Sequence, residues 1–187
     1  MPSPRYPVGL PTDELFLIDD PALQSAVRSM LRRLPPVSGA PVAVRATRGL
    51  RDRRGDVHAG AFLRTRCLIF DCTPAEFPRI FVHELFHFVW LRVGNARRRS
   101  FEDLLRNESH RGELGWSAEW RRRELRASDI RARNRRWREY CCESFCDTAA
   151  WIYSGVRKHE EFTLAARFRR IRRKWFHATI GTRELSI

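Results

Sequence analysis

The chain has 187 residues, of which 43% are hydrophobic, and its formal net charge is +14. This length fits one domain, and six Trp and twelve Phe are enough to build a core, which excludes a disordered chain. No apolar run reaches the roughly 18 residues that cross a bilayer, and the N-terminus lacks the basic start and apolar stretch of a secretory signal. We therefore expect a single domain over residues 1–187, in the cytoplasm and without membrane contact.

The N-terminal part predicts a single helix. Residues 1–18 are rich in proline and are expected to extend over the surface. Asp20 is a capping residue, and Pro21 suits the first helical turn. The spacing predicts a helix over residues 21–34, which the two prolines that follow bring to an end.

Three strand-like runs come next, at residues 41–47, 57–65 and 67–71. The arginine-containing segments that separate them are typical of turns. A small, mostly antiparallel sheet is the expected result.

A strongly apolar helix is predicted directly after the last strand. Thr73 and Glu76 form the pattern of a capping box, and Pro74 stands at the first helical position. The helix is expected to run to about Val93 and to end at Gly94. Because it is apolar on nearly every face, it should lie at the centre of the domain.

The rest of the chain is predicted to be helical. The expected helices cover residues 101–108, 117–126, 129–154 and 163–178. The predicted fold class is therefore α+β and predominantly helical, with the small sheet packed on the central helix and a helical C-terminal half.

The central helix carries His83, Glu84 and His87 within an apolar run. Burying three polar side chains there is costly unless each has a strong partner. The two histidines are four residues apart, so both imidazoles project from one helical face and can bind one metal ion. This is the HExxH motif of zinc hydrolases, in which the glutamate acts as general base on a water that the zinc ion activates.

A catalytic zinc ion needs a third protein ligand. Glu143 and Asp147 are again four residues apart in an otherwise apolar segment, so a carboxylate pair there calls for a cation or hydrogen-bond donors. Glu143 is the preferred ligand, and Asp147 is expected to accept the distal N–H of a ligand histidine. His110 and Glu113 are the alternatives for the third ligand.

The sequences HELFH at 83–87 and ESFCD at 143–147 together resemble the gluzincin metallopeptidases, which include thermolysin and the compact ImmA/IrrE-like family. The resemblance extends over residues 57–154. It implies a zincin-like fold, a Zn²⁺ cofactor, and hydrolysis of peptide bonds in a substrate that a sheet strand aligns. A site completed by His110 would instead resemble the three-histidine site of SprT-like proteases.

Hydrolysis also needs a donor that stabilises the tetrahedral oxyanion. Tyr140 is the first choice, because it lies three residues before Glu143 on much the same helical face. Tyr153, His110 and His177 are the other options. The strand that receives the substrate is expected just before the motif helix, where a peptide would bind by strand addition.

Two other groups of residues are assigned structural roles. Trp116 and Trp120 are interpreted as helix-packing aromatics, with a cover over the cleft as the alternative. The five cysteines are odd in number, and two are adjacent, which suits a reducing compartment. We interpret them as small buried hydrophobic residues, because the CxxC spacing typical of zinc sites is absent.

The positive charge comes almost entirely from arginine. Runs such as FRRIRRKW are interpreted as solvated helix faces, and the alternative is a surface that binds nucleic acid or another polyanion. This alternative would make the protein a basic binding or regulatory module whose metal site is structural or vestigial. A third hypothesis keeps the same metal site but assigns it to an amidase that acts on a small substrate.

Overall fold

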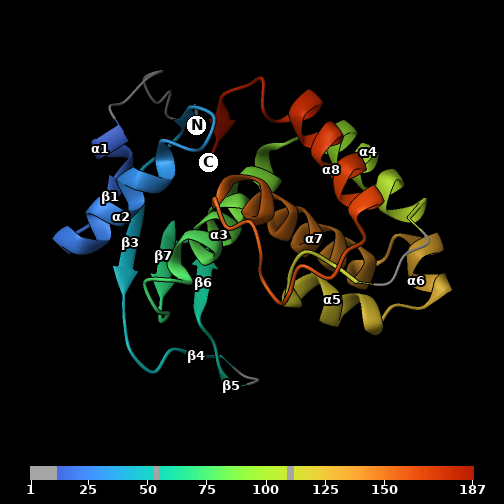
Figure 1. Ribbon diagram of the computed structural model, residues 1–187, viewed down its shortest axis with the longest axis horizontal. Coiled ribbons are helices and arrows are strands. Elements are labelled where there is room, and N and C mark those ends of the chain that lie inside the picture. Colours follow the sequence, from blue (N-terminus) through green and yellow to red (C-terminus); the bar gives the residue numbers. More distant parts are fainter. Residues whose placement is uncertain (1–11, 53–54, 109–111) are drawn as a thin grey trace, which may run out of the picture.

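The computed structural model describes residues 12–52, 55–108 and 112–187, in an α+β fold that is mostly helical (Figure 1). Its helices are α1 (Thr12–Leu15), α2 (Pro21–Leu31), α3 (Phe77–Arg92), α4 (Asn95–Arg106), α5 (Trp116–Arg123), α6 (Ala127–Ala132), α7 (Arg135–Tyr153) and α8 (Ala166–Thr179). Its strands are β1 (Phe16–Leu17), β2 (Val37–Ser38), β3 (Val42–Ala46), β4 (Arg51–Asp52), β5 (Gly55–Asp56), β6 (Ala59–Phe62), β7 (Cys67–Phe70) and β8 (Leu185–Ser186).

The main sheet is mixed, and the expectation of a mostly antiparallel sheet was wrong. Its four strands lie in the order β1-β3-β7-β6, in which only the β6–β7 pair is antiparallel. The chain leaves β3, forms β6 at the sheet edge and returns as β7 between the two. Three of the four residues of β7 are buried, as expected for a central strand whose two faces are both covered.

The end of the segment expected to extend over the surface contributes to the core. Residues 12–17 form α1 and β1, and the side chains of Leu15 and Phe16 are buried. Phe16 pairs with Val42 in a parallel ladder, which adds β1 to the sheet. The apolar pair therefore overrides the proline-rich composition of the segment that precedes it.

Helix α3 lies at the centre of the fold, as predicted. Its Phe81, Leu85, Phe86 and Phe88 have no exposed surface, and it packs against β6 and β7 on one side and α7 on the other. It begins at Phe77, three residues later than expected, because the preceding residues form a turn. The predicted C-terminal end of the helix is correct, because α3 stops at Arg92, just before Gly94, which has a positive φ.

The long helix expected over residues 129–154 is two helices. Arg133 adopts a left-handed conformation with φ of 47°, and this residue ends α6. The side chain of Asn134 then accepts a hydrogen bond from the backbone N–H of Trp137 at 3.2 Å, which caps the start of α7. A capping side chain inside the apparent helix is the signal for this break.

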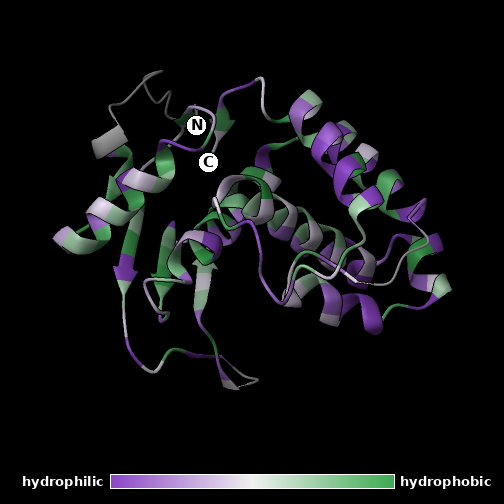
Figure 2. Ribbon diagram, viewed as in Figure 1, coloured by the Kyte–Doolittle hydropathy of each residue, from purple (hydrophilic) through white to green (hydrophobic). Residues whose placement is uncertain are grey.

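Hydropathy follows this arrangement. Figure 2 shows many hydrophilic residues along α5 and α8, which lie at the periphery of the helical half, and more hydrophobic residues in the strands and along α3. Among the residues that the structure describes, no helix is both long and apolar enough to cross a membrane.

One arginine of α8 is fully buried. The guanidinium of Arg172 contacts Glu108 and Glu113, each with an N–O distance of 2.7 Å, and also donates to the Ser144 hydroxyl at 2.8 Å. This ion-pair network joins α8 to α7 and to the segment before α5. Arg172 is therefore structural, although it belongs to the arginine run that was the candidate polyanion surface.

We expect the substitution Arg172→Leu to lower the free energy of unfolding by about 3–5 kcal/mol, because it removes the cation from two buried carboxylates. Arg170→Leu on the exposed side of α8 is the matched control and should change it by less than about 0.5 kcal/mol. Urea unfolding followed by circular dichroism measures both. Equal stability of the two variants would contradict a structural role for Arg172.

Candidate metal centre

Two helices bring the predicted ligands together. α3 and α7 lie side by side at the centre of the molecule (Figure 1), and each presents a polar pair with a four-residue spacing. His83 Nε2 lies 3.2 Å from Glu143 Oε2, and His87 Nε2 lies 3.9 Å from the same oxygen. One ligand atom from each of His83, His87 and Glu143 falls within 4.8 Å of the others.

The spacing of these atoms fits a zinc ion. Bonds of about 2.0–2.1 Å in a tetrahedral site separate neighbouring ligand atoms by about 3.3 Å. The distance of 3.2 Å between His83 and Glu143 matches this separation, and the 3.9 Å from His87 needs only a small adjustment. The three side chains are between 12% and 16% exposed, so the cluster is not sealed from solvent. Two imidazoles and one carboxylate are also a donor set that zinc accepts.

Asp147 orients the first histidine, as the sequence predicted. The Nδ1 atom of His83 donates to Asp147 Oδ1 at 2.7 Å, which leaves its Nε2 toward Glu143. The other oxygen of Asp147 accepts the backbone N–H of Ala118 at 3.1 Å. A Cβ atom at Gly115 would lie only 2.2 Å from the Asp147 carboxylate carbon, so glycine is required for this close approach.

Arg121 is a contact that the sequence did not reveal. Its Nη2 atom lies 3.0 Å from Glu143 Oε1, the oxygen that does not face the histidines. Arg121 was one residue of the run WRRREL, whose members are alike in sequence. Only the packing of α5 against α7 distinguishes it.

The electrostatics of the cluster favour positive charge. Burial would lower the pKa of His83, but the Asp147 and Glu143 carboxylates outweigh it and hold that pKa well above its ordinary value. Burial also lowers the pKa of His87, but the contacts with Cys142 and Glu143 outweigh it and raise that pKa to about 9. For Glu143, the contacts with both histidines overcome burial and lower the pKa to about 2. A divalent cation can supply the charge that protons otherwise supply here.

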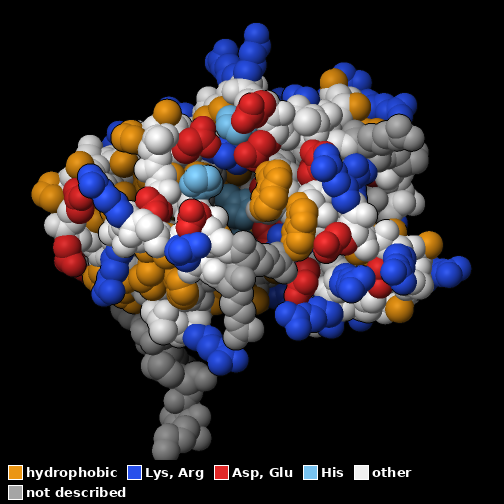
Figure 3. All heavy atoms as spheres, turned by 90° about the horizontal axis from the view of Figure 1, so that it is seen from below, with side chains coloured by type: hydrophobic (Ala, Val, Ile, Leu, Met, Phe, Trp, Pro, Cys, Tyr) orange, Lys and Arg blue, Asp and Glu red, His pale blue; other side chains and the backbone are white. Residues whose placement is uncertain are grey.

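Glu84 lies beside the cluster rather than within it. Together with His83 and Asp147, it lines a cleft of about 400 Å³ between the start of α3, the start of α5 and the segment that leads into β6. Figure 3 shows histidine and acidic side chains gathered around a hollow on this face of the molecule. A group on the adjoining helical face, next to the ligands, is where a general base is needed.

Tyr140 does not join the cluster. Its hydroxyl is buried and donates to Glu113 Oε1 at 2.6 Å. Glu113, the alternative third ligand, is held by Arg172 in the buried network and is not part of the cluster either. The helical spacing that placed Tyr140 near Glu143 could not show which neighbour would take its hydroxyl.

The other options for the oxyanion donor lie elsewhere. The ring of Tyr153 stacks on Phe86 in the core, with 5.6 Å between centroids. His177 is exposed on α8. His110, which was also the alternative third ligand, lies outside the described residues.

The predicted role of the cysteines is only partly correct. All five are free thiols, and Cys67, Cys141 and Cys146 are buried, as expected. Cys142, however, is half-buried, and its Sγ atom lies 3.4 Å from His87 Nδ1. The second imidazole of the candidate metal centre thus has a thiol as its partner where the first has a carboxylate.

No protein-family model matches the chain, and no curated protein and no solved structure is significantly similar to it. The resemblance to gluzincins therefore depends on the two motifs and on the geometry that brings them together.

We expect Asp147→Asn to weaken zinc binding by about 10- to 100-fold. The amide can accept from His83 or from the Ala118 N–H with its single oxygen, and its NH₂ group then opposes the other donor. Competition with a chromophoric chelator measures the affinity. Asp103→Asn on the exposed surface of α4 is the control and should bind zinc like the unsubstituted protein. An unchanged affinity in Asp147→Asn would show that Asp147 does not support the ligand.

Proposed function

We propose that the protein is a zinc-dependent hydrolase with a zincin-like catalytic domain, and that it is a metallopeptidase of gluzincin type. The observation that carries the proposal is the convergence of His83, His87 and Glu143 within 4.8 Å, next to a cleft that Glu84 lines. A structural zinc site normally has four protein ligands and is closed to water. Three ligands with partial exposure are typical of a catalytic site, which keeps one position open.

Each residue of the site has a specific role in this proposal. When bound, zinc supplies a Lewis acid that polarises the scissile carbonyl and makes water more acidic. Glu84 accepts a proton from the attacking water and delivers it to the leaving amine. Asp147 keeps the proton of His83 on Nδ1, and Arg121 holds the outer oxygen of Glu143, so both ligands present the required atom.

The sheet edge supports a peptide as the substrate. β6 is an edge strand of the main sheet, and its first residue, Ala59, lines the cleft together with His58 and Glu84. An edge strand offers unpaired backbone N–H and C=O groups, to which an extended peptide can add as a further strand. A small amide would not need such an edge, which favours a peptidase over an amidase.

Two residues on the walls of the cleft are suited to contact the substrate. Trp116 lines the cleft with 65% of its surface exposed, and its ring stacks on Trp120 at a centroid distance of 6.2 Å. His58 also lines the cleft and carries an imidazole that can donate to the oxyanion in place of Tyr140. Both assignments are part of the proposal.

Metal analysis of the purified protein tests the ligand set. We expect about one zinc ion per chain in the wild type, in line with a mononuclear catalytic site. Glu143→Ala should lose it, because one of three protein ligands is removed. Glu84→Gln should retain it, because the base is not a ligand. The same zinc content in all three proteins would show that Glu143 is not a ligand. No zinc in any of them would mean that the cluster is held by hydrogen bonds and binds no metal.

Cleavage of a proteome-derived peptide library, read by mass spectrometry, tests the reaction. The zinc-loaded wild type should generate new peptide termini. Glu84→Gln, loaded with the same amount of zinc, should cleave about 10²–10⁴-fold more slowly, because it cannot accept the proton. Equal cleavage by both proteins would exclude Glu84 as the base, and cleavage of small amides alone would favour the amidase.

A further inference from the structure

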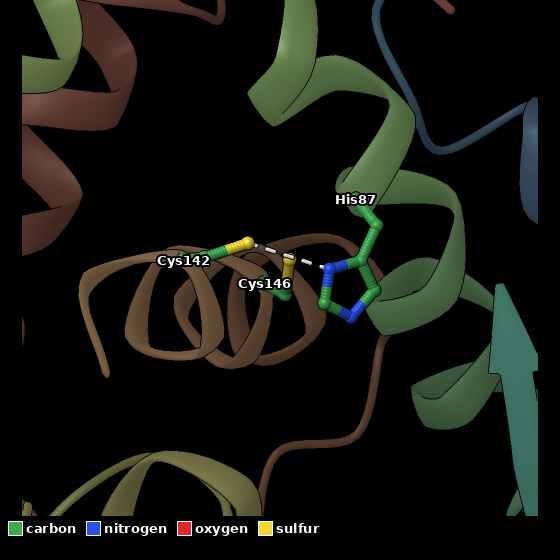
Figure 4. A group of neighbouring side chains, drawn as sticks. All are labelled: His87, Cys142 and Cys146. Atoms are coloured by element: carbon green, nitrogen blue, oxygen red, sulfur yellow. Dashed lines mark hydrogen bonds between the residues drawn. The ribbon is translucent and has the colours of Figure 1, made fainter. Parts of the chain in front are cut away.

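A second cluster of metal-binding atoms lies on the far side of His87. Cys142 and Cys146 are four residues apart on α7, so both thiols project from the helical face that packs against α3. Figure 4 shows the two sulfur atoms beside the Nδ1 edge of the His87 imidazole, with Cys142 Sγ at 3.4 Å from Nδ1. One ligand atom from each of these three residues lies within 4.8 Å of the others.

We propose that His87, Cys142 and Cys146 form a second metal site, which takes a thiophilic ion such as Cu(I) or Cd²⁺. A nitrogen and a sulfur bound to one tetrahedral ion, with bonds of about 2.0 and 2.3 Å, are about 3.5 Å apart. The observed distance of 3.4 Å between His87 Nδ1 and Cys142 Sγ is close to this value. Two thiolates and an imidazole are soft ligands, which prefer such ions to Mg²⁺ or Ca²⁺. Each thiol releases its proton to solvent when the ion binds.

Partial exposure gives an ion a route to this site. Cys146 is buried, whereas Cys142 and His87 both retain exposed surface. The site is therefore held in place by the α3–α7 packing and is not sealed from solvent.

The two sites share His87 and therefore compete for it. The Nε2 atom of His87 faces Glu143, at 3.9 Å from Oε2, while its Nδ1 atom faces Cys142. A neutral imidazole has only one nitrogen with a free lone pair, so it can bind one ion at a time. A thiophilic ion on the cysteines would thus withdraw His87 from the zinc ligands. This regulatory consequence rests on the proposed hydrolase function, whereas the existence of the thiol site does not.

Cys142 has a different role when zinc occupies the first site. With Nε2 bound to zinc, Nδ1 carries the proton and donates it to the Cys142 sulfur, as His83 donates to Asp147. The two partners differ in chemistry. A carboxylate accepts the hydrogen bond from the imidazole but binds soft ions poorly, whereas a thiolate is a strong ligand for them. Because His83 has a carboxylate partner and His87 has a thiol partner, the His87 side of the candidate metal centre is the side that responds to thiophilic ions.

Titration of the metal-free, reduced protein with Cd²⁺ tests the thiol site. Thiolate-to-cadmium charge transfer gives an ultraviolet band that reports sulfur ligands alone. The wild type, Glu143→Ala and the matched control Cys72→Ser should show the band with similar affinity. Cys142→Ser and Cys146→Ser should each bind Cd²⁺ more than about tenfold more weakly. Because Cys146 is buried, its substitution can destabilise the fold, and thermal melting of both variants without metal controls for this. Cys142 is half-buried, so the result for Cys142→Ser decides the test if Cys146→Ser does not fold.

Preloading with zinc tests the shared histidine. The wild type should then need more Cd²⁺ to give the same band and should release zinc as the band forms. A band of wild-type strength in both Cys142→Ser and Cys146→Ser would overturn the thiol site. A band that forms without release of zinc would overturn the competition for His87. A wild type that binds no zinc but shows a band dependent on Cys142 and Cys146 would refute the hydrolase proposal and support the thiol site.

Discussion

The packing of α3 against α7 is the constraint on which the rest of the site depends. Both helices are largely buried, so the polar side chains along their contact, His83, His87, Glu143 and Asp147, are mostly withdrawn from water and need partners within the protein. Hydrogen bonds join these side chains, and the carboxylates of Asp147 and Glu143 raise the pKa of His83, so the cluster favours positive charge. In the proposed function a zinc ion supplies positive charge at this contact, so the residues that would bind the ion also join the two helices.

The members of the candidate cluster could be predicted from the sequence, because a four-residue spacing on an apolar helix fixes which side chains share a face. The atoms that orient them could not. Ala118, Gly115 and Arg121 come from the segment around α5, and their contacts with Asp147 and Glu143 depend on how α5 packs on α7. The same limit explains Tyr140, where helical periodicity gave the approximate direction of the side chain but not its partner. Cys142 was interpreted only as a small buried residue, and its contact with His87 was not predicted.

In the fold, local signals predicted the elements better than their pairing. The ends of α2, α3 and α8 fall within about three residues of those expected. Asp20 and Pro21 mark the start of α2, and a left-handed glycine follows the end of α3. The position of β7 between β3 and β6 depends instead on contacts between residues far apart in the chain. Its near-continuous apolar sequence, CLIF, is consistent with a central strand but does not specify its neighbours. The break at Arg133 had a local signal in Asn134, which the apolar pattern on both sides obscured.

The central claim is that one zinc ion joins α3 to α7 through two imidazoles and one carboxylate. X-ray absorption at the zinc edge of the zinc-loaded protein tests it most directly, because sulfur and nitrogen or oxygen ligands give distinct distances. We predict a shell of nitrogen and oxygen atoms at about 2.0–2.1 Å, the outer-shell scattering of two histidines, and no sulfur. A sulfur shell at about 2.3 Å would place the zinc ion on the cysteines instead and would contradict the claim.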